Sequence, residues 1–239
     1  MLRLEGVGVA YGKSAEVLRN LNLSLSAGEF LSVVGPNGSG KSTLLKAIAG
    51  AIPVRRGRIL IDGKENDFRS VSYVFQDPAM GTVGNFTVLE NMALAWRRGE
   101  RRFPVPFLNG RRRKIFRDRL ADLAMGLEER LATPARALSG GQRQALALAM
   151  AVLRDSRLLL LDEATAALDP RSAERIMALA NRIVRESGRA CIAVTHSLQQ
   201  AIAYGDRLLV LRNGIAVAQF AGEEKSRLSA GELFARYES

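Results

Sequence analysis

The sequence predicts an α/β fold around a mostly parallel sheet, and three observations lead to this class. Short apolar stretches of strand length alternate along the chain with amphipathic stretches of helix length, which is typical of parallel strands covered by helices on both faces. Hydrophobic residues make up 47% of the 239 residues, enough for a sizeable core. The longest aliphatic runs, such as residues 158–161, are strand-sized, far below the roughly 20 residues that span a bilayer. We therefore expect a soluble chain.

The first part of the chain is expected to hold an antiparallel β subdomain. Residues 2–9 and 21–25 alternate apolar and polar side chains, which suits half-exposed antiparallel strands. Residues 30–34 form an apolar strand that leads into a glycine-rich loop, and residues 42–49 then form a helix that Gly50 ends. Two further strands are expected at residues 58–61 and 71–75.

Residues 77–137 differ in composition from the rest of the chain. They contain more arginine, several Pro and Gly residues, and helical stretches at residues 89–96 and 114–125. We interpret them as an inserted α-helical subdomain within a single domain of residues 1–239. Residues 1–76 and 138–239 would form its core.

The last part of the chain returns to alternating strands and helices. Ser139 can cap a helix that continues through residues 145–153. Apolar side chains recur on one helical face over residues 176–184, and Gly188 ends that helix. Strands are expected at residues 158–161, 190–195, 207–211 and 215–219.

The glycine-rich loop reads GPNGSGKST over residues 35–43 and matches the phosphate-binding pattern GxxxxGK[ST]. Its glycines let backbone N–H groups curl around phosphate oxygens, and the following helix points its positive end at the same anion. Lys41 can reach the β- and γ-phosphates, and the Ser42 hydroxyl can ligate Mg²⁺. The pattern indicates a P-loop NTPase core and these ATP-binding residues: Gly35, Asn37, Gly38, Gly40, Lys41, Ser42 and Thr43.

Two acids, Asp162 and Glu163, end the apolar strand at residues 158–161. Ligands of open α/β sheets bind beyond the carboxyl ends of the strands, so both side chains can reach the phosphate loop. Asp162 suits the Mg²⁺ shell, and Glu163 suits the polarisation of an attacking water. A strand that simply ends in solvated acids is the alternative, and the phosphate loop favours the catalytic interpretation.

Residues 138–142 read LSGGQ, about 20 residues before the two acids. The phosphate loop, this segment, the acid pair and a downstream histidine stand in the order found in ATP-binding cassette (ABC) ATPases, which the chain resembles over nearly its whole length. The resemblance implies binding and hydrolysis of ATP with Mg²⁺. It also implies that two cassettes pack head to tail, each ATP lying between the phosphate loop of one and the LSGGQ signature of the other. The signature adds Ser139, Gly140, Gly141 and Gln142 to the ATP-binding set.

Four further positions take their roles from the resemblance. Tyr11 stands where relatives stack an aromatic ring on adenine, and Gln76 matches the glutamine that senses Mg²⁺ and the attacking water. His196, the single histidine, matches the histidine that contacts the γ-phosphate. Asp169 matches the loop that crosses the dimer interface. The expected catalytic residues are thus Glu163, His196 and Gln76, and the expected Mg²⁺ ligands are Ser42, Gln76 and Asp162.

The resemblance also implies the partners. A single cassette looks like the subunit of a prokaryotic importer, paired with a second cassette in a homodimer and with integral membrane permease subunits, and served by a solute-binding protein. Residues 75–82 and 87–91 look like cassettes of amino-acid uptake systems. The expected place is the cytoplasm, peripheral to the cytoplasmic face of the membrane. The alternative is a non-transport ABC ATPase that acts on ribosomes or nucleic acid.

The net charge of +11 is concentrated in one segment. Residues 97–119 carry ten Arg or Lys residues and only two acids. Three interpretations stay open: a solvated helical face, a surface that faces anionic lipid or acidic permease loops, or a nucleic-acid contact. Regularly spaced base-stacking aromatics are missing from the segment, so no direct nucleic-acid partner is expected.

Overall fold

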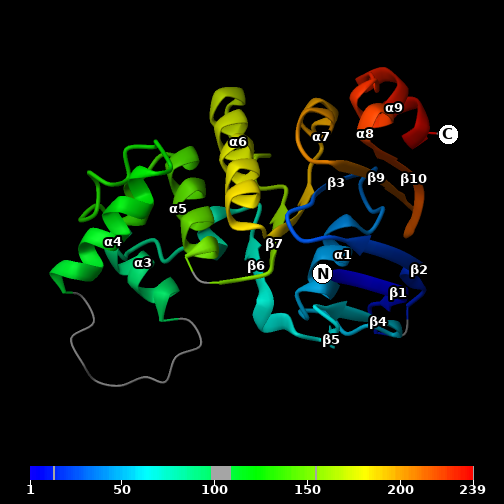
Figure 1. Ribbon diagram of the computed structural model, residues 1–239, viewed down its shortest axis with the longest axis horizontal. Helices are drawn as coiled ribbons and strands as arrows, with labels where there is room; N and C mark the ends of the chain where they lie inside the picture. Colours follow the sequence, from blue (N-terminus) through cyan, green and yellow to red (C-terminus); the bar gives the residue numbers. More distant parts are fainter. Residues whose placement is uncertain (13, 98–108, 154, 239) are drawn as a thin grey trace.

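A computed structural model describes residues 1–12, 14–97, 109–153 and 155–238 of the chain (Figure 1). It contains a four-stranded sheet, a six-stranded sheet and helices packed against both. None of the helices in these described ranges is both long enough and apolar enough to cross a membrane.

The larger sheet has the strand order β10-β9-β3-β8-β7-β6. All of its neighbouring strands are parallel except the β9–β10 pair, which is antiparallel. This arrangement confirms the mostly parallel sheet that the sequence predicts. The strands are β3 (Phe30–Val34), β6 (Val71–Val74), β7 (Leu158–Asp162), β8 (Ala190–Val194), β9 (Arg207–Arg212) and β10 (Ile215–Ala221).

The smaller sheet is antiparallel and has the order β2-β1-β4-β5. It confirms the β subdomain expected in the first part of the chain. Helix α1 (Lys41–Ile48) lies between the two sheets (Figure 1), because its apolar face joins one buried cluster with side chains of both. The strands are β1 (Leu2–Ala10), β2 (Glu16–Leu25), β4 (Arg56–Ile61) and β5 (Lys64–Glu65).

The alternation of side chains along the parallel strands divides the core into layers. In β7, Leu158 and Leu160 face α1 and the smaller sheet, whereas Leu159 and Leu161 face the helices on the other side. Because each strand of a parallel sheet is buried on both faces, β7 is apolar at both sets of positions. A third cluster packs the C-terminal helices on β9 and β10.

The helices of residues 77–152 form the left part of Figure 1. Helix α3 begins at a complete capping box, in which the Thr87 side chain accepts from the backbone N–H of Glu90. The rings of Trp96 and Phe116 meet edge to face with centroids 5.7 Å apart, which joins α3 to α4. The helices are α2 (Pro78–Gly81), α3 (Val88–Trp96), α4 (Gly110–Ala121) and α5 (Gly140–Val152).

The remaining helices follow β7, β8 and β10 in the chain. They are α6 (Pro170–Ser187), α7 (Leu198–Ala203), α8 (Gly222–Ser226) and α9 (Ala230–Glu238). Gly188 ends α6 in the left-handed conformation, as expected. The sequence did not predict β5, α2, α7, α8 or α9. The bounds predicted for the helix at residues 114–125 were wrong, because α4 begins and ends four residues earlier. The division into subdomains at residues 76 and 137 stays a prediction.

Candidate active site

The phosphate loop joins β3 to α1 and needs its glycines for two close approaches. At Gly35 the backbone has φ +157°, and an added Cβ would lie 1.9 Å from the carbonyl oxygen of Leu211. At Gly40 φ is +102°, and a Cβ would lie 2.7 Å from the Leu18 side chain. The loop can therefore run against β9 and β2 only without side chains at these positions.

Lys41 folds back over the loop that precedes it. Its Nζ donates to the carbonyl oxygens of Gly35 at 2.7 Å and Pro36 at 3.0 Å. Burial lowers the pKa of Lys41, and the nearby carboxylates of Glu163 and Asp162 oppose this shift. Lys41 is also the first residue of α1, so its charge adds to the positive end of that helix. The two sources of positive charge lie together, which suits an anion.

A cavity of about 260 Å³ opens beside Lys41. It is lined by Val17, Asn37, Gly38, Gly40, Lys41, Ser42, Thr43 and Glu163. Six of these residues belong to the predicted ATP-binding set, and Glu163 is the carboxylate predicted to polarise the attacking water. The fold therefore brings the phosphate loop and the end of β7 to one cavity.

The Asp162 carboxylate is held at both oxygens. Ser42 Oγ donates to Oδ1 at 3.0 Å, and Tyr73 Oη donates to Oδ2 at 2.6 Å. Hydroxyl and carboxylate oxygens are the ligands that Mg²⁺ prefers. Ser42 and Asp162 are already within hydrogen-bond distance, so the donor set of the predicted metal site fits this ion.

Tyr73 reaches Asp162 from the neighbouring strand β6. Burial raises the pKa of the Tyr73 hydroxyl far above its ordinary value, and the hydrogen bond to Asp162 raises it further. The hydroxyl therefore stays protonated and remains a donor at neutral pH. Tyr73 was not among the site residues predicted from the sequence. The two-residue spacing of Tyr73 and Phe75 places both side chains on the same face of β6. No sequence signal identifies Asp162, 89 residues away, as the hydrogen-bond partner of Tyr73.

Glu163 and His196 lie against each other at the ends of β7 and β8. The Glu163 Oε1 atom is 2.5 Å from His196 Nε2. The Glu163 backbone is in the left-handed region with φ +49°, and its N–H donates to the carbonyl oxygen of Val194 at 3.0 Å. This hydrogen bond to β8 stabilises the turn from which the Glu163 side chain reaches the phosphate-loop cavity.

Gln76 is placed by the register of β6 and β7. Val74 pairs with Leu161 in these parallel strands. Gln76 lies two residues after Val74 and Glu163 lies two residues after Leu161, so both follow the same end of the sheet. Gln76 is exposed. Its position at this edge of the sheet agrees with the expected place beside the acid pair.

Tyr11 stands at the rim of the same region. Its hydroxyl lies 3.2 Å from Thr43 Oγ1, and either atom can donate. Tyr11 is 46% exposed. Stacking of adenine there stays a prediction.

The signature segment begins α5. Ser139 Oγ accepts from the Gln142 backbone N–H at 3.2 Å, and the Gln142 side chain accepts from the Ser139 N–H at 3.3 Å. Gly140 and Gly141 form the first turn, which leaves helix N–H groups free to bind an anion. Among the residues that line the phosphate-loop cavity in the described part of the chain, none belongs to the signature.

Asp169 has a structural role within the chain. Its carboxylate caps α6 by accepting from the Ser172 N–H at 3.0 Å, and these hydrogen bonds lower the pKa of Asp169. A Cβ on Gly141 would lie 3.0 Å from Ser172 Oγ. The capped start of α6 thus packs directly on the signature turn.

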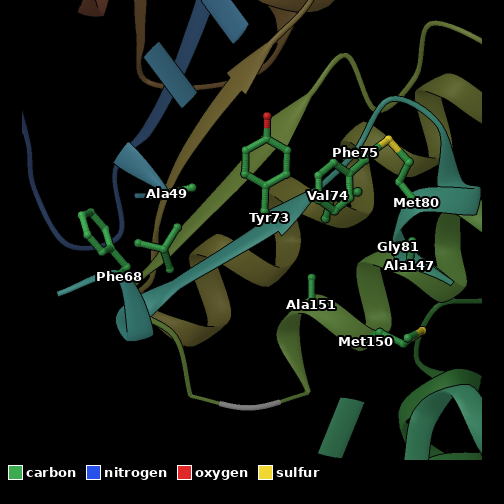
Figure 2. A pocket seen from close by; sticks show the side chains of 11 residues that line it. Ala49, Phe68, Tyr73, Val74, Phe75, Met80, Gly81, Ala147, Met150 and Ala151 are labelled. Atoms are coloured by element: carbon green, nitrogen blue, oxygen red, sulfur yellow. The ribbon is translucent and has the colours of Figure 1, made fainter. Parts of the chain in front are cut away.

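A second cavity, which we call the β6 pocket, lies between β6, α2 and α5 and has a volume of about 280 Å³ (Figure 2). Figure 2 shows Phe75 and Met80 toward one end and Phe68 toward the other. Met80 is 70% exposed. The pocket is lined by Ala49, Phe68, Val71, Tyr73, Val74, Phe75, Met80, Gly81, Ala147, Met150 and Ala151. Its lining side chains are apolar apart from the Tyr73 hydroxyl, and they include Phe75, the residue before Gln76.

The sequence of the chain matches known ATP-binding proteins. The profile of the ABC transporter family covers residues 18–166. The tyrosine transport ATP-binding protein of Clostridioides difficile (strain R20291) is 37% identical over 235 residues, which cover 95% of this chain and 93% of that protein. The thiamine import ATP-binding protein ThiQ of Histophilus somni (strain 129Pt) is 36% identical over 202 residues, which cover 82% of this chain and 90% of that protein.

Solved structures agree with this relationship. A dimeric ATP-binding cassette in a post-hydrolysis state, bound to ADP and Pi, has a TM-score of 0.79 and 30% identity, covering 92% of this chain and 98% of that chain. An ATP-binding subunit of an ABC transporter has a TM-score of 0.82 and 25% identity, covering all of both chains. The chain belongs to the ABC transporter family and is an ATPase.

Proposed function

We propose that the chain is the ATP-hydrolysing subunit of an ABC importer and drives a separate membrane permease through ATP-dependent closure of a cassette dimer. The observation that carries this proposal is the separation of two anion-binding sites on one chain. One is the phosphate loop with Lys41, and the other is the capped signature turn that starts at Ser139. An ATP that contacts both needs a second cassette, and the similar cassette bound to ADP and Pi is dimeric.

Each predicted site residue then has a role. Lys41 and the loop N–H groups bind the β- and γ-phosphates, and Tyr11 stacks on the base. Ser42 and Asp162 would hold Mg²⁺ together with Gln76, and the ion would supply positive charge that offsets charge on the phosphoryl oxygens. Glu163 accepts a proton from the attacking water, while His196 orients the γ-phosphate.

The nucleotide can drive closure because its contacts differ between the two states of the dimer. In the open state it binds only the phosphate loop, and in the closed state the partner subunit adds the turn from Ser139 to Gln142. A ligand shifts an equilibrium by the difference in its affinity for the two states. Cleavage of the γ-phosphate removes the group that bridges the subunits, and the dimer opens. Asp169 would lie at this interface.

The β6 pocket is the proposed docking place of a permease helix. Its lining side chains are apolar apart from the Tyr73 hydroxyl, they include the exposed Met80, and Phe75 among them precedes Gln76 in the chain. Movement of Gln76 when the dimer closes would shift a permease helix bound in the β6 pocket. A helix in a groove is a common recognition mode that buries an apolar face.

Import and the cargo are inferred from relatives. One is named for tyrosine transport and another for thiamine import, and residues 75–82 and 87–91 resemble amino-acid uptake cassettes. We propose an amino acid as cargo, a solute-binding protein as a partner, and a location in the cytoplasm, peripheral on the cytoplasmic face of the membrane. The cations of α4, exposed except for the half-buried Arg112, would face anionic lipid there.

Affinity purification of the tagged Glu163→Gln variant with ATP, from gently solubilised native cells, tests the proposal. Recovery of proteins with many membrane spans supports a transporter motor and identifies the permease. Recovery of ribosomes or DNA-processing proteins instead contradicts it and assigns the chain to a non-transport ABC ATPase.

A paired variant tests the docking place. Met80→Lys puts a charge on the pocket rim and should abolish recovery of the permease while the isolated cassette keeps its ATPase activity. Leu94→Lys is the control, because Leu94 is also exposed, at 50%, but lies outside the pocket lining. Equal recovery with both variants would exclude this docking place.

A further inference from the structure

We propose that Tyr73 is a positioning residue for the metal site: its hydroxyl holds the Asp162 carboxylate in the orientation in which it binds Mg²⁺. The proposal rests on the part of the proposed function that assigns Mg²⁺ to Ser42 and Asp162. Tyr73 itself would not contact the ion or the nucleotide.

The hydrogen bonds on the Asp162 carboxylate fix its orientation and leave acceptor positions open. An ionised carboxylate has about four acceptor positions on its two oxygens. Ser42 Oγ occupies one position on Oδ1, and Tyr73 Oη occupies one on Oδ2, at 2.6 Å. One position on each oxygen is left for a metal ion or its waters. With a donor on each side, rotation of the carboxylate about its Cβ–Cγ bond would break a hydrogen bond.

Tyr73 is itself fixed in place at its backbone and at its ring. Its backbone pairs with Leu160 in the register of β6 and β7, so its Cα is set relative to the strand that carries Asp162. Its ring packs on Phe75 with centroids 4.6 Å apart. A side chain that is held at both backbone and ring loses little entropy when it makes the hydrogen bond, which makes it an effective anchor for Asp162.

Groups that hydrogen-bond to metal ligands orient them, and their loss weakens metal binding by about 10- to 100-fold. Ser42 is a predicted ligand and must share its oxygen with the ion. Tyr73 holds no predicted ligand role, so its hydrogen bond to Asp162 is free to persist when the metal site is filled.

The test replaces the hydroxyl and keeps the ring. Tyr73→Phe preserves the contact with Phe75 and the wall of the β6 pocket, so permease docking stays intact. We measure Mn²⁺ binding to the isolated cassette with a non-hydrolysable ATP analogue, from the electron paramagnetic resonance signal of free Mn²⁺. We expect about tenfold weaker Mn²⁺ binding, with unchanged affinity for the nucleotide in EDTA. The Mg²⁺ concentration for half-maximal ATPase should rise by a similar factor, while kcat recovers at saturating Mg²⁺.

Tyr204→Phe is the matched control. It also removes one tyrosine hydroxyl, which donates to the Glu174 carbonyl oxygen at 3.4 Å, and it should leave Mn²⁺ binding unchanged. In an Asp162→Ala background, Tyr73→Phe should have no further effect, because the acceptor is gone.

Mn²⁺ binding by Tyr73→Phe within about twofold of wild type would overturn the proposal, as would an equal further loss in the Asp162→Ala background. Tyr73→Met gives a second hydroxyl-free variant if the phenylalanine variant does not fold. Unchanged Mn²⁺ binding by Tyr73→Phe would not affect the affinity purification, because that experiment uses a chain with wild-type Tyr73. Failure to recover a permease in the purification would likewise not affect the Mn²⁺ measurement, which uses the isolated cassette.

Discussion

The Nε2 atom of His196 lies 2.5 Å from the Oε1 atom of Glu163, so the side chains that end β8 and β7 meet at the edge of the phosphate-loop cavity. The Glu163 side chain is 13% exposed and that of His196 is 42% exposed. The contact holds the acid close to the cavity that Lys41 and Ser42 also line.

Glu163→Gln should separate binding from hydrolysis. The amide keeps the size of the side chain but accepts no proton, so turnover should fall roughly 100-fold or more. ATP affinity should be unchanged, and the closed dimer should accumulate. ATPase assays and size-exclusion chromatography with ATP measure both effects. Glu186→Gln, at an exposed position of α6, is the control, and turnover of Glu163→Gln near the wild-type rate would contradict the role of this acid.

Lys41→Ala should abolish ATP binding. Charge-assisted hydrogen bonds contribute about 1.5–3 kcal/mol each, so loss of those to the phosphates should weaken ATP affinity by at least ~100-fold. Isothermal titration calorimetry measures this directly. Lys46→Ala removes a lysine from the exposed face of the same helix and should bind ATP normally. Retained affinity in Lys41→Ala would refute the loop assignment.

Ser139→Ala and Thr87→Ala form a matched pair, because both residues cap a helix in a complete capping box. Loss of either cap should lower the free energy of unfolding by about 1 kcal/mol. Only Ser139→Ala should also lose ATP-dependent dimerisation, with turnover reduced on the order of tenfold to hundredfold. Denaturant unfolding and ATPase assays distinguish the two effects. Equal turnover in both variants would show that Ser139 serves the helix alone.

The triple change of Arg111, Arg112 and Arg113 to Glu should weaken membrane association. Each cation near an anionic surface adds about 1 kcal/mol, so vesicles that contain phosphatidylglycerol should bind the variant at least ~100-fold more weakly. Vesicles of phosphatidylcholine alone are the control. Unchanged recovery in native membranes with the permease present would show that α4 is only a solvated face.

Local patterns predicted the strands well because their signals are short and strong. The four leucines before Asp162 and the apolar run before His196 are buried strands in the structure. The boundaries of α4 were wrong because Arg111 to Arg113 carry no apolar repeat. Its start is set instead by Asn109, which caps the helix by accepting from the Arg112 N–H.

The assembly of the candidate site was predictable only in part. Sequence order and resemblance indicated that Lys41, Asp162 and Glu163 share one site, and the structure places Lys41 and Glu163 at one cavity. The hydrogen bond from Tyr73 to Asp162 could not be predicted, because it depends on the register between two strands far apart in the chain. The capping role of Asp169 was also missed, although an Asp followed directly by Pro170 at the first helical position is a sequence signal for it.

The backbone of Glu163, with φ +49°, has a further consequence. A residue with a Cβ in this conformation costs roughly 1–2 kcal/mol relative to an ordinary one. Glycine would remove that cost, so Glu163→Gly should unfold at a higher temperature than other inactive variants of the same position. The wild-type chain therefore carries a local backbone cost at the residue to which hydrolysis is assigned, and thermal unfolding of Glu163→Gly beside Glu163→Ala measures that cost.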